Sequence, residues 1–180
     1  MTEPLLDAKV LAIARALDDA NIPHAFGGAL SLAYYGVPRA TEDIDLNLFV
    51  APGDAERCLA ALTPLGITRG AASEAGEPQS TWHWNHTPIH AFFAYDPFHE
   101  SCRARSRRVP FADGEIAILG AEDIAIFKLI YDREKDRSEV REVMLCLGER
   151  LDVDYMRKWL ERILGSSDAR VARFAAWAGG

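Results

Sequence analysis

The sequence predicts a mixed α/β fold of the α+β kind, with a small mixed β-sheet flanked by helices in residues 1–119 and a helical bundle in residues 120–180. Short apolar runs, several of which alternate with polar residues, recur before residue 120 and indicate strands. Segments with helical periodicity separate some of these runs. From Ala121 onward the pattern is helical only.

The first region is built of short elements. Helices are predicted over residues 4–20, 29–35 and 54–62, where apolar residues recur at helical spacing. Strands are predicted over residues 24–26, 43–50, 81–85, 88–95, 107–111 and 115–119. The small polar residues 70–80 predict a loop, and Ala112-Asp113-Gly114 has a composition typical of a hairpin turn.

The second region is predicted to be entirely helical. Its helices are expected over residues 122–131, 135–147, 153–164 and 168–177.

Composition narrows the class of protein. With 49% hydrophobic and 26% charged residues, the 180-residue chain is typical of a globular protein. The net charge of −7 argues against passive binding to nucleic acid. Four arginines between residues 103 and 108 still allow a local contact with a polyanion, although a solvated surface explains them equally well.

Targeting signals are not evident in the sequence. The three cysteines are widely spaced and include no Cys-x-x-Cys pair, which favours reduced thiols over a disulfide framework. Neither a signal peptide nor a membrane-spanning stretch is recognisable. We therefore expect a soluble cytoplasmic protein with no membrane partner.

Two motifs in the first region indicate phosphate chemistry. Gly27-Gly28 lies between a predicted strand and a predicted helix, where glycine lets a phosphate approach the backbone closely. Asp43 and Asp45 are two residues apart on a predicted strand, so both carboxylates point to one face. Such a pair suits Mg²⁺. Either motif alone is common, and their order along the chain makes the combination more specific.

A second cluster of charged residues lies in the helical region. Lys128 interrupts an apolar run, so its amine either reaches solvent or meets an anion. Asp136 and Glu139 are three residues apart on one helical face. They are expected to orient Lys128 or Arg133, or to hold a water on the metal; an ordinary surface acidic pair is the alternative.

These motifs resemble those of the nucleotidyltransferase superfamily. The stretch Gly27-Gly28 followed by Arg39-x-Thr41-x-Asp43-x-Asp45 is similar to its AbiEii/MenT-type branch, which includes many toxins of bacterial toxin–antitoxin systems. The blocks 122–128 and 133–139 are similar to a later motif of that branch. The resemblance covers about residues 20–145.

The resemblance implies an enzyme that transfers a nucleotide from a nucleoside triphosphate to an acceptor hydroxyl and releases pyrophosphate. In toxin members the acceptor is the 3′ end of tRNA, so tRNA and a cognate antitoxin are the expected partners. The expected cofactor is Mg²⁺, with Mn²⁺ as the alternative. The helical region 120–180 is expected to share the active-site cleft of region 1–119.

Each motif residue then has an expected role. The metal ligands are Asp43 and Asp45, which form the catalytic group together with Lys128 and Asp136. The residues expected to bind the nucleotide are Gly27, Gly28, Arg39 and Thr41. Arg133, Glu139 and His90 are supplementary candidates.

His90 is the one departure from the superfamily pattern, which has a third carboxylate on a later strand. Imidazole is a poor Mg²⁺ ligand and a better ligand for Mn²⁺ or Zn²⁺. The interpretation we favour is a site with two metal carboxylates, in which Asp136 takes over the work of the missing acid. His90 as general base, or a weakened site that only binds nucleotide, are the alternatives.

Three rival hypotheses remain. The first is an antibiotic nucleotidyltransferase that modifies an aminoglycoside-like drug. The second is a catalytically inactive module that binds nucleotide or protein. The third is a plain α/β domain in which the Asp-x-Asp motif is accidental. A structural zinc site is a separate alternative, drawn from four histidines and a cysteine: His83, His86, His90, His99 and Cys102.

Overall fold

The computed structural model describes residues 3–71 and 76–179. Its strands are β1 (His24–Phe26), β2 (Ile44–Leu48), β3 (Ile67–Arg69), β4 (Gln79–Trp84), β5 (Thr87–Phe93), β6 (Arg107–Phe111) and β7 (Gly114–Ile118). Its helices are α1 (Leu6–Asp19), α2 (Gly28–Ala33), α3 (Ala55–Leu62), α4 (Pro97–Arg105), α5 (Ala121–Tyr131), α6 (Glu134–Leu147), α7 (Val153–Leu164) and α8 (Ala169–Ala178). The predicted α+β fold is confirmed.

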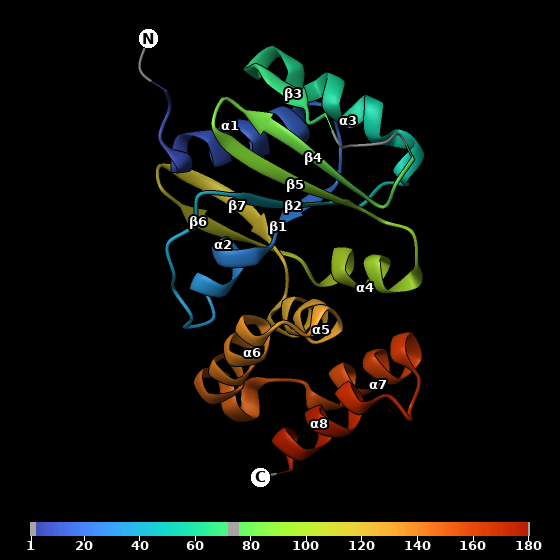
Figure 1. Ribbon diagram of the computed structural model, residues 1–180. Helices are drawn as coiled ribbons and strands as arrows, with labels where there is room; N and C mark the ends of the chain where they lie inside the picture. The colour runs from blue at the N-terminus through green and yellow to red at the C-terminus, as the bar shows by residue number, and fades with distance from the viewer. Residues whose placement is uncertain (1–2, 72–75, 180) are drawn as a thin grey trace. The chain divides into compact units, whose positions relative to one another are not determined.

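The strands form one mixed sheet in the order β3-β4-β5-β2-β1-β7-β6 (Figure 1). The pairs β2–β5 and β1–β7 are parallel, and the other neighbours are antiparallel. The two parallel pairs bring segments together that are far apart in the sequence. Strand β2 therefore lies at the centre, between β1 and β5.

Two elements, β3 and α4, were not predicted from the sequence. Strand β3 has only three residues, which is too short to show a period. Helix α4 begins with Pro97, and the Asp96 carboxylate caps it by accepting hydrogen bonds from the backbone N–H groups of Phe98 (2.8 Å) and His99 (3.3 Å). The cap followed by proline is the signal that could have located this helix. The predicted loop 70–80 is wrong at its end, because Gln79 and Ser80 belong to β4. Another part of it falls on residues 72–75, which lie outside the described residues.

The chain forms two compact units. The first runs to Leu30 and resumes from Ala40 to Leu119, and the second contains Ser31–Arg39 and the chain from Gly120 onward. Segment 31–39 lies in the sequence between the Gly27-Gly28 motif and the Asp43-x-Asp45 motif. It therefore leaves the sheet unit and packs as part of the helical unit.

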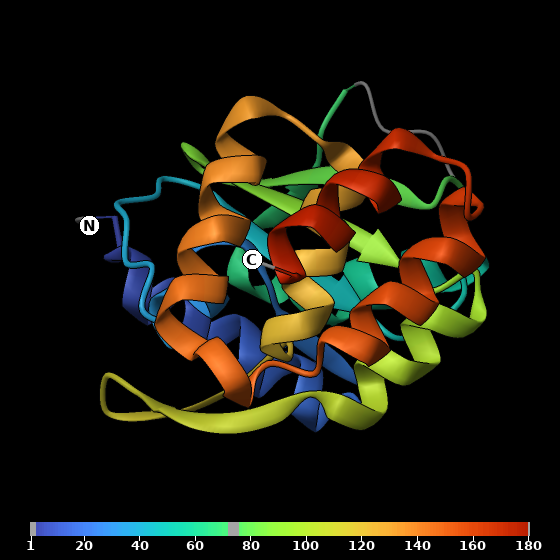
Figure 2. The same ribbon diagram turned by 90° about the horizontal axis from the view of Figure 1, so that it is seen from below.

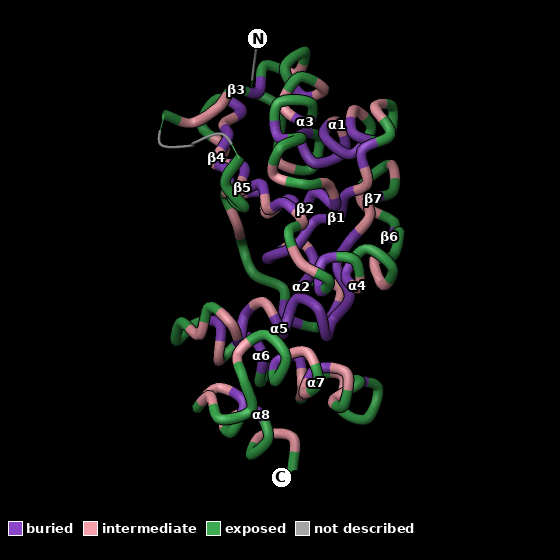
Figure 3. Tube along the Cα trace, turned by 90° about the vertical axis from the view of Figure 1, so that its right-hand side faces the viewer, coloured by how far each residue is buried: buried purple, intermediate pink, exposed green. Residues whose placement is uncertain are grey.

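The two faces of the sheet differ in polarity. Helices α1 and α3 cover one face (Figures 1 and 3). Alternate residues of the central strands are buried there, among them Leu46, Ile89 and Trp82, each 0% exposed. On the opposite face Asp45, His90 and Thr81 are only half-buried. The pleat therefore directs Asp45, His90 and Thr81 to the same face.

The helical unit is organised around α5, which packs against α6 and α7, and α8 lies beside α7 (Figure 2). Two acids of α5 are buried with hydrogen-bond donors. The Tyr155 hydroxyl donates to Asp123 Oδ1 (2.6 Å), and the backbone N–H of Asp152 donates to Glu122 Oε1 (3.0 Å). In the described part of the chain, no helix combines the length and the apolar character that crossing a bilayer requires.

Candidate active site

The turn from β1 into α2 is built on Gly27 and Gly28. The backbone N–H of Gly27 donates to the carbonyl of Asp45 (2.9 Å) and continues the pairing of β1 with β2. Gly28 has a φ of +51°, a conformation that side chains disfavour. A Cβ at this position would lie 1.7 Å from Asp45 Oδ2. The absence of a side chain at residue 28 is what lets the Asp45 carboxylate lie against this turn.

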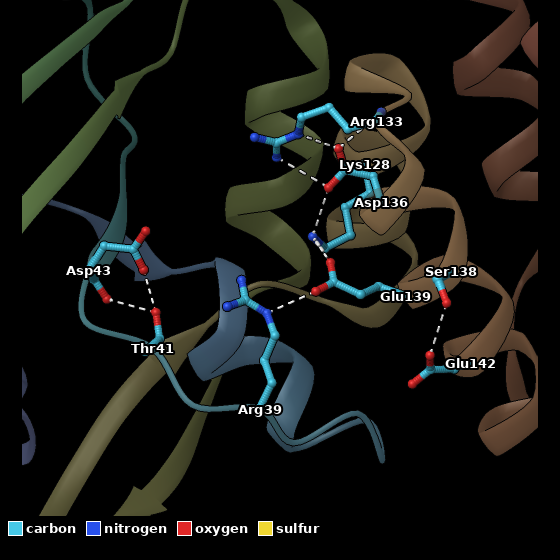
Figure 4. Close-up of polar contacts among 9 residues, drawn as sticks. All are labelled: Arg39, Thr41, Asp43, Lys128, Arg133, Asp136, Ser138, Glu139 and Glu142. Atoms are coloured by element: carbon cyan, nitrogen blue, oxygen red, sulfur yellow. Dashed lines mark hydrogen bonds and ion pairs between the residues drawn. The ribbon is translucent and has the colours of Figure 1, made fainter.

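Asp43 and Asp45 occupy the start of the central strand. Because β2 begins at Ile44, Asp43 lies one residue before the strand that was predicted to include it. The Thr41 hydroxyl donates a short hydrogen bond to Asp43 Oδ1 (Figure 4). The Asp43 side chain is 40% exposed and so remains open to solvent. In this structure Thr41, expected to contact a nucleotide, fixes a rotamer of Asp43.

His90 lies directly opposite Asp45 in the sheet. The two residues are register partners in the parallel pair β2–β5, and His90 Nε2 is 4.0 Å from Asp43 Oδ2. On its other side His90 pairs with Thr81 of β4, whose hydroxyl is 3.5 Å from His90 Nδ1. His90 therefore lies beside both aspartates of the Asp-x-Asp motif. Thr81 is a neighbour that sequence reasoning missed, although the alternation of the predicted strand 81–85 includes it.

The donor set around Asp43 and Asp45 fits a divalent metal. Both carboxylates are hard oxygen ligands, and Mg²⁺ typically takes one or two carboxylates and completes its shell with water and phosphate oxygens. Two acids that are two residues apart at the start of a central strand repel each other unless a cation is present. Among the described residues, no group of three or more His, Cys, Asp or Glu side chains is arranged to hold a metal ion. A cation here would therefore depend on the two carboxylates and on its substrate, and the histidines form no zinc site in the described residues.

The helical unit contains the second cluster of candidate residues (Figure 4). Lys128 is buried in α5, and its Nζ forms ion pairs with Asp136 Oδ1 (3.2 Å) and with Glu139 Oε2. Arg133 Nε contacts Asp136 Oδ2 at 2.6 Å, and Arg39 Nε contacts Glu139 Oε1 at 2.8 Å. The five charged side chains form one continuous network.

Asp136 is held as a carboxylate within this network. It is 0% exposed. Burial, the largest single influence, raises the pKa of its carboxyl, but the hydrogen bond from Arg133 and the charge and hydrogen bond of Lys128 together lower the pKa below its usual value. Its oxygens accept hydrogen bonds from Lys128 Nζ and from the side chain and backbone of Arg133. This environment suits a positioning residue better than a proton acceptor.

The structure groups the candidates into two sets. Within the sheet unit it brings together the six residues Gly27, Gly28, Thr41, Asp43, Asp45 and His90. Within the helical unit it brings together Lys128, Arg133, Asp136, Glu139 and Arg39. Arg39 was expected beside Thr41 in a nucleotide-binding stretch, yet its contacts belong to the helical unit. The shared cleft stays a prediction.

The arginines near residue 105 are partly neutralised. Arg108 contacts Asp18 (3.2 Å) and Glu115 (3.6 Å), and its side chain is 52% exposed. Exposed ion pairs of this kind are weak. The arginine cluster therefore remains only a candidate RNA contact.

Comparison with known proteins places the fold. No family model matches the chain, and no curated protein matches its sequence. The solution structure of the antibiotic-resistance factor ANT(2″)-Ia matches with a TM-score of 0.64 and 16% identity, over 97% of this chain and 96% of that one. The lincosamide antibiotic adenylyltransferase LnuA, with lincomycin bound, matches with a TM-score of 0.55 and 10% identity, over 77% of this chain and 96% of that one.

A fungal protein gives a similar match. An antigenic nucleotidyltransferase-like protein from Paracoccidioides brasiliensis has a TM-score of 0.53 and 15% identity, over 93% of this chain and 92% of that one. The fold is therefore that of the nucleotidyltransferases. The AbiEii/MenT-type branch stays a prediction.

Proposed function

We propose that the protein is a nucleotidyltransferase, which moves a nucleotide from a nucleoside triphosphate to an acceptor hydroxyl. The observation that carries the proposal is the contact between Gly28 and Asp45, which joins the Gly-Gly turn to the Asp-x-Asp strand. This contact places a bare backbone turn beside a carboxylate pair. Such an arrangement suits a phosphate chain that reaches the backbone while its counter-ion is held by carboxylates.

In this proposal Asp43 and Asp45 hold Mg²⁺, or Mn²⁺ as the alternative, and the cation supplies charge neutralisation at the phosphates. Thr41 keeps Asp43 in the orientation seen here. Gly27 and Gly28 leave room for phosphate oxygens at the turn. Positioning and electrostatics supply most of the catalysis in reactions of this kind.

The chemistry is a displacement at the α-phosphorus. The acceptor oxygen forms the new bond to phosphorus, the bond to the bridging oxygen breaks, and pyrophosphate leaves with that electron pair. The acceptor hydroxyl loses its proton. His90 is the side chain placed to take it, because it is register partner of Asp45 and its side chain is 31% exposed. Asp136, the acid expected for this work, is enclosed by its own cationic partners.

The acceptor we propose first is the 3′ end of tRNA, with the protein acting as a toxin and an antitoxin as partner. This rests on the motif resemblance, and the arginines at positions 103–108 are the candidate backbone contacts. Charge reversal at Arg105, Arg107 and Arg108 would then abolish modification of RNA.

A small-molecule acceptor, such as an antibiotic, is the second candidate. Strands β2, β4 and β5 contain no lysine or arginine, so the sheet face beside Asp45 suits a neutral or cationic acceptor better than a polyanion. Two of the structural neighbours are named as an antibiotic-resistance factor and as a lincosamide antibiotic adenylyltransferase.

One assay tests the proposal and separates the acceptors. The protein is incubated with Mg²⁺ and each α-labelled nucleoside triphosphate, together with total tRNA in one arm and an aminoglycoside and a lincosamide in others. Label on tRNA supports the first acceptor, and label on a drug supports the second. If no label moves and no triphosphate is consumed with Mg²⁺ or Mn²⁺, transfer is excluded and the inactive binding module replaces it.

A further inference from the structure

Lys128 is almost fully buried. Its side chain is 8% exposed, and its ammonium lies between the carboxylates of Asp136 and Glu139. Those carboxylates are 0% and 10% exposed. Two carboxylates at ion-pair distance more than compensate one ammonium. The inner part of the network therefore carries one net negative charge and does not attract an anion.

The outer part of the network has the opposite charge. Arg133 contacts Asp136, and its side chain is 58% exposed. Arg39 contacts Glu139, and its side chain is 35% exposed. Each buried carboxylate thus lies between the shared lysine and one arginine at the surface (Figure 4).

The positive charges of the network differ in their access to solvent. Among its five side chains, Lys128, Arg133 and Arg39 are the cations. Because the lysine is enclosed, the positive charge that solvent reaches is on the guanidinium groups of Arg133 and Arg39. Asp132, the residue before Arg133, contacts Arg173 and Arg137 instead.

We propose that Arg39 and Arg133 form a binding site for phosphate oxyanions in the helical unit, and that Lys128 is a positioning residue which fixes both arginines through Glu139 and Asp136. This assigns the phosphate contact to the two arginines and gives Lys128 a supporting role. The proposal does not depend on the transfer reaction.

The chemistry of the side chains favours phosphate as the ligand. A guanidinium presents several N–H donors in one plane and matches the oxygens of phosphate better than an ammonium does. A carboxylate behind each arginine limits its rotation, which lowers the entropy lost when an anion binds. Inorganic polyphosphate and the phosphate chain of a nucleotide share this chemistry.

The test is calorimetric titration of the full-length protein with tripolyphosphate, at low and high salt. Arg39→Gln and Arg133→Gln are each expected to weaken binding about tenfold, as for the loss of one charge-assisted contact. Arg141→Gln is the matched control. Arg141 is an exposed arginine on the same helix α6, its guanidinium lies 4.5 Å from the ring of Trp177, and it is outside the network.

Lys128→Met separates a positioning lysine from a direct ligand. We expect this variant to have a lower melting temperature and weaker tripolyphosphate binding. In Arg39→Lys and Arg133→Lys, we expect binding to be restored only in part relative to the glutamine variants. Unchanged affinity in both arginine variants overturns the proposal. So does a Lys128→Met variant that loses binding while it melts like the wild type.

Parallel titrations with orthophosphate and ATP identify the source of the phosphate. Equal affinity for tripolyphosphate and ATP means that the site recognises the phosphates alone. Tighter binding of ATP means that the phosphate chain recognised by the site belongs to a nucleotide. Both results support the site if they depend on the two arginines. If binding depends on the two arginines but the protein has no transfer activity, the phosphate site stands and the proposed function is contradicted. If the protein transfers a nucleotide but binding does not depend on the two arginines, only the phosphate site is contradicted.

Discussion

At residue 28 a side chain has no room. The left-handed φ of +51° and the 1.7 Å separation between a would-be Cβ and Asp45 Oδ2 act together there. We predict that Gly28→Ala displaces the Asp45 carboxylate and lowers stability by about 1–3 kcal/mol. Divalent-cation binding, measured by calorimetry with Mn²⁺ and Mg²⁺, should be lost in the same variant.

Gly66→Ala is the control for the backbone strain alone. Gly66 has a φ of +86°, but nothing lies within 4 Å of a Cβ built there. The Gly66→Ala variant should be less stable than the wild type, while its cation binding stays at the wild-type value. Equal cation binding by Gly28→Ala would contradict the role given to this contact.

Part of the candidate site can be predicted at the scale of single residues. The spacing of Asp43 and Asp45 is enough to place both carboxylates on one face, because side chains alternate along a strand. Arg39 is the opposite case. Its partner Glu139 is 100 positions further along the chain, and no local pattern relates residues so distant. Thr81 was missed for a different reason, because its relation to His90 depends on how β4 and β5 are registered.

At the scale of elements, α6 depends on Asp136, which accepts hydrogen bonds from the backbone and side chain of Arg133 at the start of this helix. The pKa of Asp136 is lowered in the folded state, so its contribution to stability is present above the unfolded value of about 3.8. It is lost as the pH falls through the folded value.

We therefore predict that Asp136→Asn lowers the free energy of unfolding at pH 7 by about 3 kcal/mol, because it breaks a buried ion pair. The difference from the wild type should shrink below pH 4. Urea unfolding at pH 7 and pH 3 measures both values. Asp154→Asn, which removes a carboxylate that is 77% exposed, should change little at either pH. A difference that grows as the pH falls would contradict the assignment.

Element prediction succeeded where a pattern was long enough to carry a period. Helices α6 and α7 have one polar and one apolar face, and both were expected close to their observed bounds. Strand β3 has three residues, and α4 has buried and exposed positions without a strong apolar stripe. The order of the strands in the sheet depends on tertiary pairing and could not be deduced from local pattern.

At the scale of the whole molecule, the chain passes between its two units more than once. Leu32, Tyr35 and Val37 are buried and belong by their contacts to the helical unit, although they precede it by more than eighty residues. We predict that residues 120–180 alone form a less stable fold than the same residues joined to segment 31–39 by a Gly-Ser linker. Thermal melts followed by circular dichroism compare the two.

A fusion with a scrambled 31–39 segment is the control for the added length. It should melt like residues 120–180 alone. If all three proteins melt at the same temperature, segment 31–39 contributes nothing to the helical unit.

The central claim is that Asp43 and Asp45 support nucleotide transfer, and release of pyrophosphate from a nucleoside triphosphate tests it most directly. The assay compares the wild type with Asp45→Asn and with Asp113→Asn, which alters an exposed acid in the turn between β6 and β7. We predict metal-dependent release by the wild type and by Asp113→Asn, and at least about a hundredfold slower release by Asp45→Asn. Release by Asp45→Asn at the wild-type rate would contradict the account.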